Sequence, residues 1–149
     1  MDKTQVLIIF PLLFSRFVQW VFPADFDKQK KVFFQPPGYV FGVVWTVLYL
    51  LLGLYSHRNL NNPVLLGIWA VNLTLNMLWT PVVNNLRMYQ TGIYIIVLMI
   101  MTALMMIVLD NNTTNKTLLI PYLTWLMVAL LLNIELARLY KGNHVKFSE

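Results

Sequence analysis

Long apolar segments separated by short polar ones dominate this chain. A helix that crosses a membrane needs ~20 predominantly apolar residues, and five segments approach or exceed that length. We predict helices at about residues 4–24, 37–57, 63–85, 89–109 and 117–140. No polar connection is long enough to build a soluble core of its own. The pattern therefore predicts one all-α integral membrane domain over residues 1–149, a bundle of five transmembrane helices.

Composition agrees with this prediction and adds an orientation. The 149 residues are 58% hydrophobic and 11% charged, with a mean hydropathy of +0.64, which is too apolar for a water-soluble domain. Outside the spans, most Lys and Arg residues fall on the face that holds the carboxyl terminus. Because basic loops stay in the cytoplasm, we expect a cytoplasmic carboxyl terminus. A basic face of this kind attracts anionic lipid head groups, so the net charge of +5 requires no nucleic-acid partner.

Composition also excludes several kinds of site. The chain has no cysteine, so disulfides, thiolate metal ligands and cysteine nucleophiles are absent. His57 lies at the end of a predicted span and His144 beyond the last one, without other ligands beside them in the sequence, and we expect no metal site. Methionines gather at 99–106, where soft packing or a lipid-facing surface is the simpler interpretation. No obligatory cofactor is expected.

Aromatic and amide side chains recur with helical spacing inside three of the spans. The three faces hold Gly42, Trp45 and Tyr49; Asn72, Asn76 and Trp79; and Trp125, Ala129 and Asn133. Residues three and four apart share a helix face, and at ~1.5 Å per residue the three faces reach similar depths. Together they are expected to line a cavity with aromatic walls, which suits a flat and largely apolar ligand.

Structural interpretations of the same residues stay open. Asparagine in a membrane bundle often bonds to a neighbouring helix, and tryptophan often lies in an interfacial belt. Trp20 and Trp69 fit such belts or packing better than a cavity. Gly38 and Gly42 follow a helix-start signal at 36–37 and are expected to let another backbone approach closely, within the chain or between chains.

Arg16 is the most costly residue of the first span. A cation inside a membrane costs several kcal/mol unless it pairs, reaches the interface or faces water. The structural interpretation, which we favour from the sequence, is a snorkelling side chain or an ion pair with Glu135. The functional interpretation is a counter-charge for a ligand carboxylate near the mouth of the cavity.

The motifs along the chain resemble the translocator protein and tryptophan-rich sensory protein family, also called the peripheral-type benzodiazepine receptors. The resemblance covers nearly the entire chain. The matching pieces are Ser15-Arg16-Phe17-Val18, Pro36-Pro37-Gly38, Phe41-Gly42-x-x-Trp45-x-x-Leu48-Tyr49, Leu75-Asn76-x-x-Trp79-x-Pro81 and Pro121-Tyr122-Leu123-x-Trp125-x-x-x-Ala129-x-x-Leu132-Asn133. Their order within a chain of this size makes the assignment specific.

The resemblance implies a five-helix bundle whose cavity is closed by a lid loop between the first two helices. Members bind porphyrins such as protoporphyrin IX, sterols and synthetic benzodiazepine ligands, and they commonly form homodimers. Spacing and resemblance together give one set of expected ligand-binding residues. It comprises Phe34, Pro37, Gly38, Trp45, Tyr49, Asn72, Asn76, Trp79, Trp125, Ala129 and Asn133, with Arg16 added.

The resemblance also implies alternatives to simple binding. Some bacterial members degrade protoporphyrin IX in light through two tryptophans, whose positions here are Trp45 and Trp125. Phe34 departs from a lid tryptophan of the family, and Ile134 and Ala137 interrupt its sterol motif.

A shifted sterol match at Leu136, Tyr140 and Lys146 is weak, because such short patterns arise easily in basic helix ends. We therefore expect a receptor or carrier for porphyrin, in tetrapyrrole sensing or transport. A porphyrin-degrading enzyme, a sterol translocator and a structural membrane protein remain alternatives. The resemblance leaves the particular membrane open.

Overall fold

The computed structural model describes residues 5–23 and 32–144, and these fold into five helices and one π-helical turn. The elements are α1 (Val6–Val21), α2 (Gly38–Arg58), α3 (Pro63–Thr80), η2 (Pro81–Asn85), α4 (Tyr89–Leu109) and α5 (Thr113–His144). No strand occurs in the part that the structure describes. The prediction of an all-α five-helix fold is confirmed.

Local signals in the sequence set where most helices begin. α2 follows Pro37, and α3 has Pro63 in its first turn, where a missing N–H has no partner to lose. Asn62 Oδ1 accepts a hydrogen bond from Leu65 N at 3.2 Å, which caps α3. Asn112 caps α5 in the same way, so α5 begins at Thr113, four residues before the expected position of 117.

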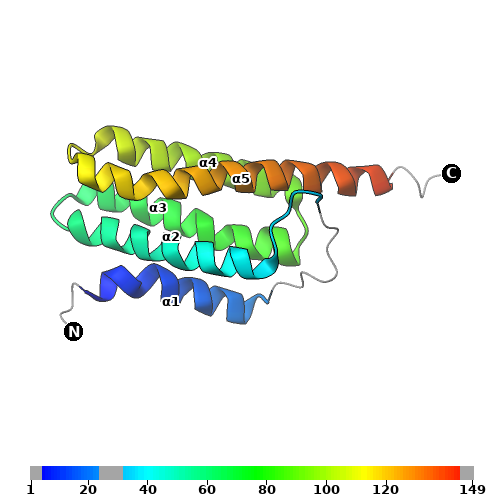
Figure 1. Cartoon of the computed structure of the whole chain (residues 1–149), viewed down its shortest axis with the longest axis horizontal. Helices are drawn as coiled ribbons and strands as arrows, with labels where there is room; N and C mark the ends of the chain where they lie inside the picture. The colour runs from blue at the N-terminus through cyan, green and yellow to red at the C-terminus, as the bar shows by residue number, and fades with distance from the viewer. Residues whose placement is uncertain (1–4, 24–31, 145–149) are drawn as a thin grey trace.

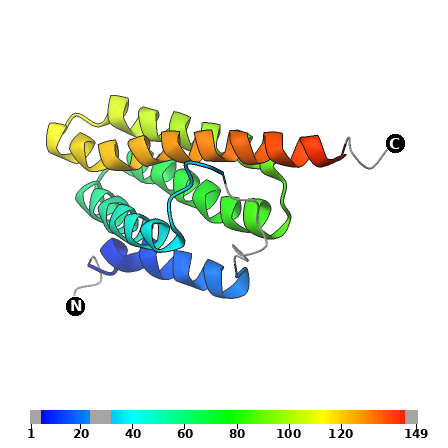
Figure 2. The same cartoon turned by 45° about the vertical axis from the view of Figure 1, so that its right-hand side comes forward.

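The five helices close into a ring. α1 packs on α2, α2 on α5, α5 on α4, α4 on α3, and α3 returns to α1. Figures 1 and 2 show α1 beginning at one end of the bundle and α5 extending past its neighbours at the other. α1 begins and α5 ends at opposite ends of the bundle because the number of roughly antiparallel helices is odd.

Side chains from all five helices fill the interior. The largest cluster of buried residues includes Leu52, Tyr55, Ile96 and Leu126, each of which is at most 1% exposed. A second cluster lies at the other end of the bundle, where Val32 packs with residues of η2, α4 and α5. Figures 1 and 2 show the segment 32–37 crossing from the start of α2 towards α5. The described part of the loop between α1 and α2 is thus anchored on α5.

Close helix packing depends on glycines other than the expected ones. A Cβ added at Gly53 would overlap the backbone of Ile8 on α1, and one at Gly92 would meet the side chains of Val83 and Asn133. At Gly38 and Gly42, by contrast, nothing lies within 4 Å of the Cβ position. The expectation that these two glycines admit another backbone within the chain is wrong, because they border open space.

The helix that precedes α4 does not run unbroken to its expected end at residue 85. From Pro81 it widens into the π-helical turn, in which Leu86 N donates a hydrogen bond to Pro81 O at 3.0 Å, five residues back. Proline cannot donate to the helix and crowds the preceding turn, so a change of geometry at this residue is physically reasonable. The turn sets the direction of Asn84, which reaches the site described below.

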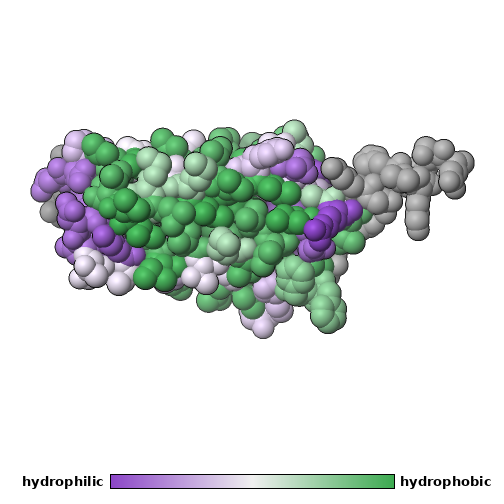
Figure 3. All heavy atoms as spheres, turned by 90° about the horizontal axis from the view of Figure 1, so that it is seen from above, coloured by the Kyte–Doolittle hydropathy of each residue, from purple (hydrophilic) through white to green (hydrophobic). Residues whose placement is uncertain are grey.

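The outer surface is suited to lipid. Four helices are long and apolar enough to cross a membrane, while α1 is apolar but has 16 residues. At ~1.5 Å per residue α1 spans about 24 Å, less than the ~30 Å hydrocarbon core. Figure 3 shows a broad apolar face over α4 and α5, with hydrophilic residues gathered towards the ends.

Candidate ligand-binding site

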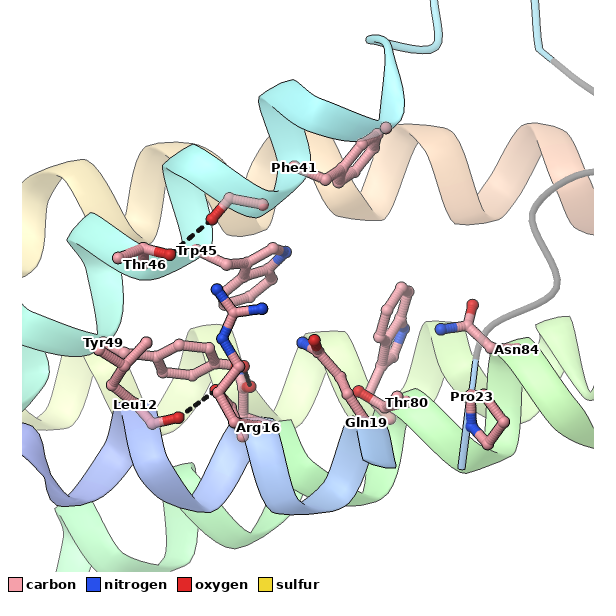
Figure 4. A pocket seen from close by; sticks show the side chains of 15 residues that line it. Leu12, Arg16, Gln19, Pro23, Phe41, Trp45, Thr46, Tyr49, Thr80 and Asn84 are labelled. Carbon is pink, nitrogen blue, oxygen red and sulfur yellow. Dashed lines mark hydrogen bonds between the residues drawn. The ribbon is translucent and has the colours of Figure 1, made fainter. Parts of the chain in front are cut away.

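A cavity of about 370 Å³ lies between α1, α2 and the α3–η2 region. This volume falls within the ~300–1,000 Å³ of small-molecule sites. Figure 4 shows it from close by. Its lining consists of Leu12, Ser15, Arg16, Gln19, Pro23, Gly38, Phe41, Gly42, Trp45, Thr46, Tyr49, Asn76, Trp79, Thr80 and Asn84. We call it the outer cavity, because several of these residues remain exposed.

Aromatic rings form two sides of the outer cavity. On α2, Phe41, Trp45 and Tyr49 follow one another at intervals of four residues and therefore share a face. Trp45 stacks on Tyr49 with ring centroids 5.3 Å apart and an interplanar angle of 26°. Trp79 on α3 also lines the cavity. A flat apolar ligand would find stacking surfaces here.

A chain of hydrogen bonds fixes the deep end of the outer cavity. The Tyr49 hydroxyl donates to Asn76 Oδ1 at 2.8 Å, and Asn76 Nδ2 donates to the Tyr122 hydroxyl at 3.3 Å. Tyr122 then donates to Asn72 Oδ1 at 2.7 Å, and Asn72 Nδ2 donates to Met99 O at 2.9 Å. The chain links α2, α3, α4 and α5, so the position of Tyr49 is set by the whole bundle.

A second, inner cavity of about 40 Å³ lies between α2, the α3–η2 region and α5. Phe41, Trp45, Trp79 and Asn84 line both cavities. The remaining lining residues are Gln35, Val83, Trp125, Ala129, Leu132, Asn133 and Leu136. A water needs roughly 10–15 Å³ of such space, so the inner cavity has room for a very small group.

Three residues that line the inner cavity have buried polar atoms without partners. Trp79 Nε1, Trp125 Nε1 and Asn133 Oδ1 are buried and make no hydrogen bond in the described part of the chain. Asn133 itself is only 1% exposed, and its amide Nδ2 donates a hydrogen bond to Tyr89 O at 2.6 Å. Each unpaired buried group costs about 1–3 kcal/mol. Two donors and one acceptor suit a water or a small polar substituent.

Phe41 is one of the four residues that line both cavities. Its ring stands edge-on to Trp125, with centroids 5.5 Å apart and an interplanar angle of 71°. Trp45 and Trp125 therefore share only the inner cavity, and Trp45 alone of the two also lines the outer one. From the sequence we expected both indoles in one chamber with room for a flat ligand, whereas the cavity that they share holds about 40 Å³.

The structure brings most of the expected residues to one of the two cavities. The outer cavity receives Arg16, Gly38, Trp45, Tyr49, Asn76 and Trp79, and the inner one receives Trp45, Trp79, Trp125, Ala129 and Asn133.

Three expected residues lie elsewhere. Phe34 is 50% exposed and lines neither cavity, whereas the next residue, Gln35, lines the inner one. Pro37 caps α2 outside both linings. Asn72 is held in the hydrogen-bond chain by Tyr122 and Met99.

Several cavity residues were missed by the sequence argument although a signal for them exists. Thr80 and Asn84 continue the spacing of Asn76 by four residues each, and Gln19 follows Arg16 by three. Phe41 precedes Trp45 by one helical turn. Extending each periodic face by one turn would have found them.

The charged and sterol-motif residues of α5 have other surroundings. Glu135 forms an ion pair with Arg138 at 2.7 Å, so the expected pair between Arg16 and Glu135 is wrong. Leu136 faces the inner cavity, while the Tyr140 ring packs on Tyr89 with centroids 4.5 Å apart. Lys146 lies outside the described residues. Within these residues no group of three or more His, Asp or Glu side chains could hold a metal.

Comparison with known proteins now identifies the family. The sequence model of the TspO/MBR family matches residues 6–139. This range contains α1 to α4 and all but the last residues of α5. The chain belongs to the TspO/MBR family. Together with its four long apolar helices, this makes it an integral membrane protein.

Several curated TspO/MBR relatives are similar over most of their length. Protein CrtK of Rhodobacter capsulatus is 31% identical over 129 residues, covering 80% of this chain and 81% of the relative. A tryptophan-rich sensory protein of Cereibacter sphaeroides is 32% identical over 119 residues, covering 76% and 75%. A translocator protein homolog of Schizosaccharomyces pombe is 29% identical over 123 residues, covering 74% of each. The range matched by the family model includes the residues that line both cavities.

Proposed function

We propose that this TspO/MBR protein is a membrane receptor for a flat tetrapyrrole of the protoporphyrin IX type, in tetrapyrrole sensing or transport. The observation that carries the proposal is the outer cavity, whose sides are formed by Trp45, Tyr49 and Trp79. The name of the relative from Cereibacter sphaeroides, a tryptophan-rich sensory protein, supports a sensory role. The proposed ligand enters the outer cavity with its ring against Trp45.

Size and shape support this assignment. The outer cavity is open at residues such as Gly42 and Gln19, which remain exposed, so a large macrocycle would be partly enclosed and partly in contact with lipid. Aromatic stacking contributes about 0.5–1.5 kcal/mol beyond buried area for each ring pair. The inner cavity is too small for a macrocycle and suits only a substituent.

Tryptophan variants test the proposal. Protoporphyrin IX is titrated into the protein in nanodiscs, with the shift of its Soret band as the signal and empty nanodiscs as the blank. We expect saturable binding that weakens roughly tenfold in Trp45→Ala, because stacking and buried area are lost. Trp125→Ala should weaken binding less, since Trp125 lines only the inner cavity.

Trp20→Ala is the matched control, because Trp20 is 80% exposed and lines neither cavity. Its affinity should equal that of the unmodified protein. If the signal follows the lipid content and is the same in all variants, the porphyrin partitions into the bilayer and the proposed site is refuted.

A further inference from the structure

Arg16 is a cation placed in the middle of a helix that faces the outer cavity. It lies five residues before the last residue of α1, between Ser15 and Phe17 along the chain. Figure 4 shows its guanidinium projecting from α1 towards Trp45 on α2. The side chain therefore reaches the space where the proposed ligand would lie.

No partner for this cation occurs among the residues that the structure describes. Neither a hydrogen bond nor an ion pair joins Arg16 to any of them. The two described carboxylates are engaged elsewhere: Glu135 accepts from Arg138 at 2.7 Å, and Asp110 accepts from Asn112 N at 2.8 Å. An arginine at membrane depth has five N–H donors to satisfy, which makes an external acceptor favourable.

Arg16 shares the outer cavity with polar side chains and aromatic rings. Gln19 lies one turn further along α1, and Thr80 and Asn84 line the cavity from the α3–η2 region (Figure 4). Aromatic rings, Trp45 among them, line the same space. A ligand that matches this lining has a flat aromatic body and an anionic or hydrogen-bonding edge.

We propose that Arg16 binds a carboxylate of the ligand, so that the outer cavity selects the acid form of a tetrapyrrole over its neutral esters. The proposal rests on the proposed function and deepens it. A guanidinium binds a carboxylate through two parallel N–H donors, and the interaction strengthens where water is scarce. The carboxylate edge then lies on the side of Gln19 and Thr80, and the ring plane lies against Trp45.

A comparison of two ligands tests this selection. Protoporphyrin IX and its dimethyl ester share one macrocycle, but only the former carries carboxylates. In nanodiscs of zwitterionic lipid, the unmodified protein should bind the acid about tenfold more tightly than the ester. Arg16→Gln should lose this preference by weakening the acid alone, and Arg16→Lys should keep part of it because the charge remains.

Arg58→Gln is the charge-matched control, since Arg58 is exposed at the opposite end of α2 and lines neither cavity. It should keep the full preference for the acid. An acid-to-ester ratio that is the same in the unmodified protein and in Arg16→Gln would overturn the proposal for Arg16 while leaving porphyrin binding intact. Failure of both ligands to bind the unmodified protein would instead refute the proposed function, and this proposal with it.

A lipid phosphate would bind Arg16 through the same hydrogen bonds as a ligand carboxylate. A second set of titrations distinguishes the two anions. The titrations are repeated in nanodiscs that contain anionic phosphatidylglycerol. If Arg16 holds the ligand carboxylate, the acid preference persists in both lipids. If Arg16→Gln changes acid and ester binding equally, and only in anionic lipid, the group bound is a lipid phosphate and the carboxylate assignment is refuted.

Discussion

The hydroxyl of Tyr122 connects more of the molecule than any other polar atom described above. It accepts a hydrogen bond from Asn76 and donates one to Asn72, which in turn reaches the backbone of α4. The ring also stands edge-on to Trp45, with centroids 6.5 Å apart. One buried side chain of α5 thus holds the deep end of the outer cavity in place.

Tyr122→Phe should lower the free energy of unfolding by about 1–3 kcal/mol, because it leaves buried amide groups of Asn72 and Asn76 without their partner. The measurement is the midpoint of denaturant-induced unfolding in detergent. Tyr94→Phe is the control, since Tyr94 is 62% exposed on α4. Equal midpoints for the two variants would contradict the structural role given to Tyr122.

The two asparagines of α3 show what sequence spacing leaves open. The spacing placed Asn72 and Asn76 correctly on one face of α3, and both are buried. It could not decide which of them would reach the cavity, because that depends on where Tyr122 of α5 enters. Tyr122 bonds to both amides, and only Asn76 also reaches Tyr49 at the cavity.

The packing of α1 against α2 is decided by one glycine. Gly53 lies directly against the backbone of Ile8, so the two helices meet at a point where no side chain fits. Towards the other end of α2, Gly38 and Gly42 border the outer cavity and touch nothing within 4 Å of their Cβ positions. Close contact at one end and open space at the other give the cavity its place between these helices.

Gly53→Ala should destabilise the protein by about 1–3 kcal/mol, because the added methyl group forces α1 away from α2. Gly67→Ala, at an exposed glycine of α3 with open space around its Cβ, should be neutral or slightly stabilising through helix propensity. Thermal unfolding of both variants in one detergent measures the difference. Indistinguishable transitions would show that the contact with Ile8 is not tight.

Element positions were largely predictable from the sequence, whereas their local geometry was not. Apolar length and proline or asparagine caps placed the helices within a few residues. The π-helical turn after Pro81 was not expected, because an isolated proline signals only that the helix is disturbed. The tightly packed glycines were not expected either, since glycine spacing does not reveal whether a backbone or a cavity lies beside it.

For the molecule as a whole, α1 begins and α5 ends at opposite ends of the bundle (Figure 1), so we expect them on opposite sides of a membrane. Seven Lys or Arg residues fall on the side of the carboxyl terminus and three on the other, when Arg16 within its span is left out. Such a bias predicts a cytoplasmic carboxyl terminus. Homodimer formation likewise stays a prediction, since it rests on the family resemblance.

Single cysteines can test the orientation directly, because the chain has none of its own. Asn61→Cys in the turn between α2 and α3 should react with a membrane-impermeant maleimide in intact cells. Gln90→Cys at the start of α4, on the opposite side, should react only after the cells are opened. Both positions are exposed, so the reverse labelling pattern would mean that the orientation is inverted.

If a flat ligand occupies the outer cavity, a side chain that fills this cavity should exclude the ligand. Gly42→Leu places a side chain in open space inside the cavity, and Gly67→Leu places the same side chain outside both cavities. The measurement is the dissociation constant of protoporphyrin IX in nanodiscs for the two variants. We expect at least about tenfold weaker binding for Gly42→Leu and none of this loss for Gly67→Leu. Equal affinities of the two variants would mean that protoporphyrin IX does not bind in the outer cavity.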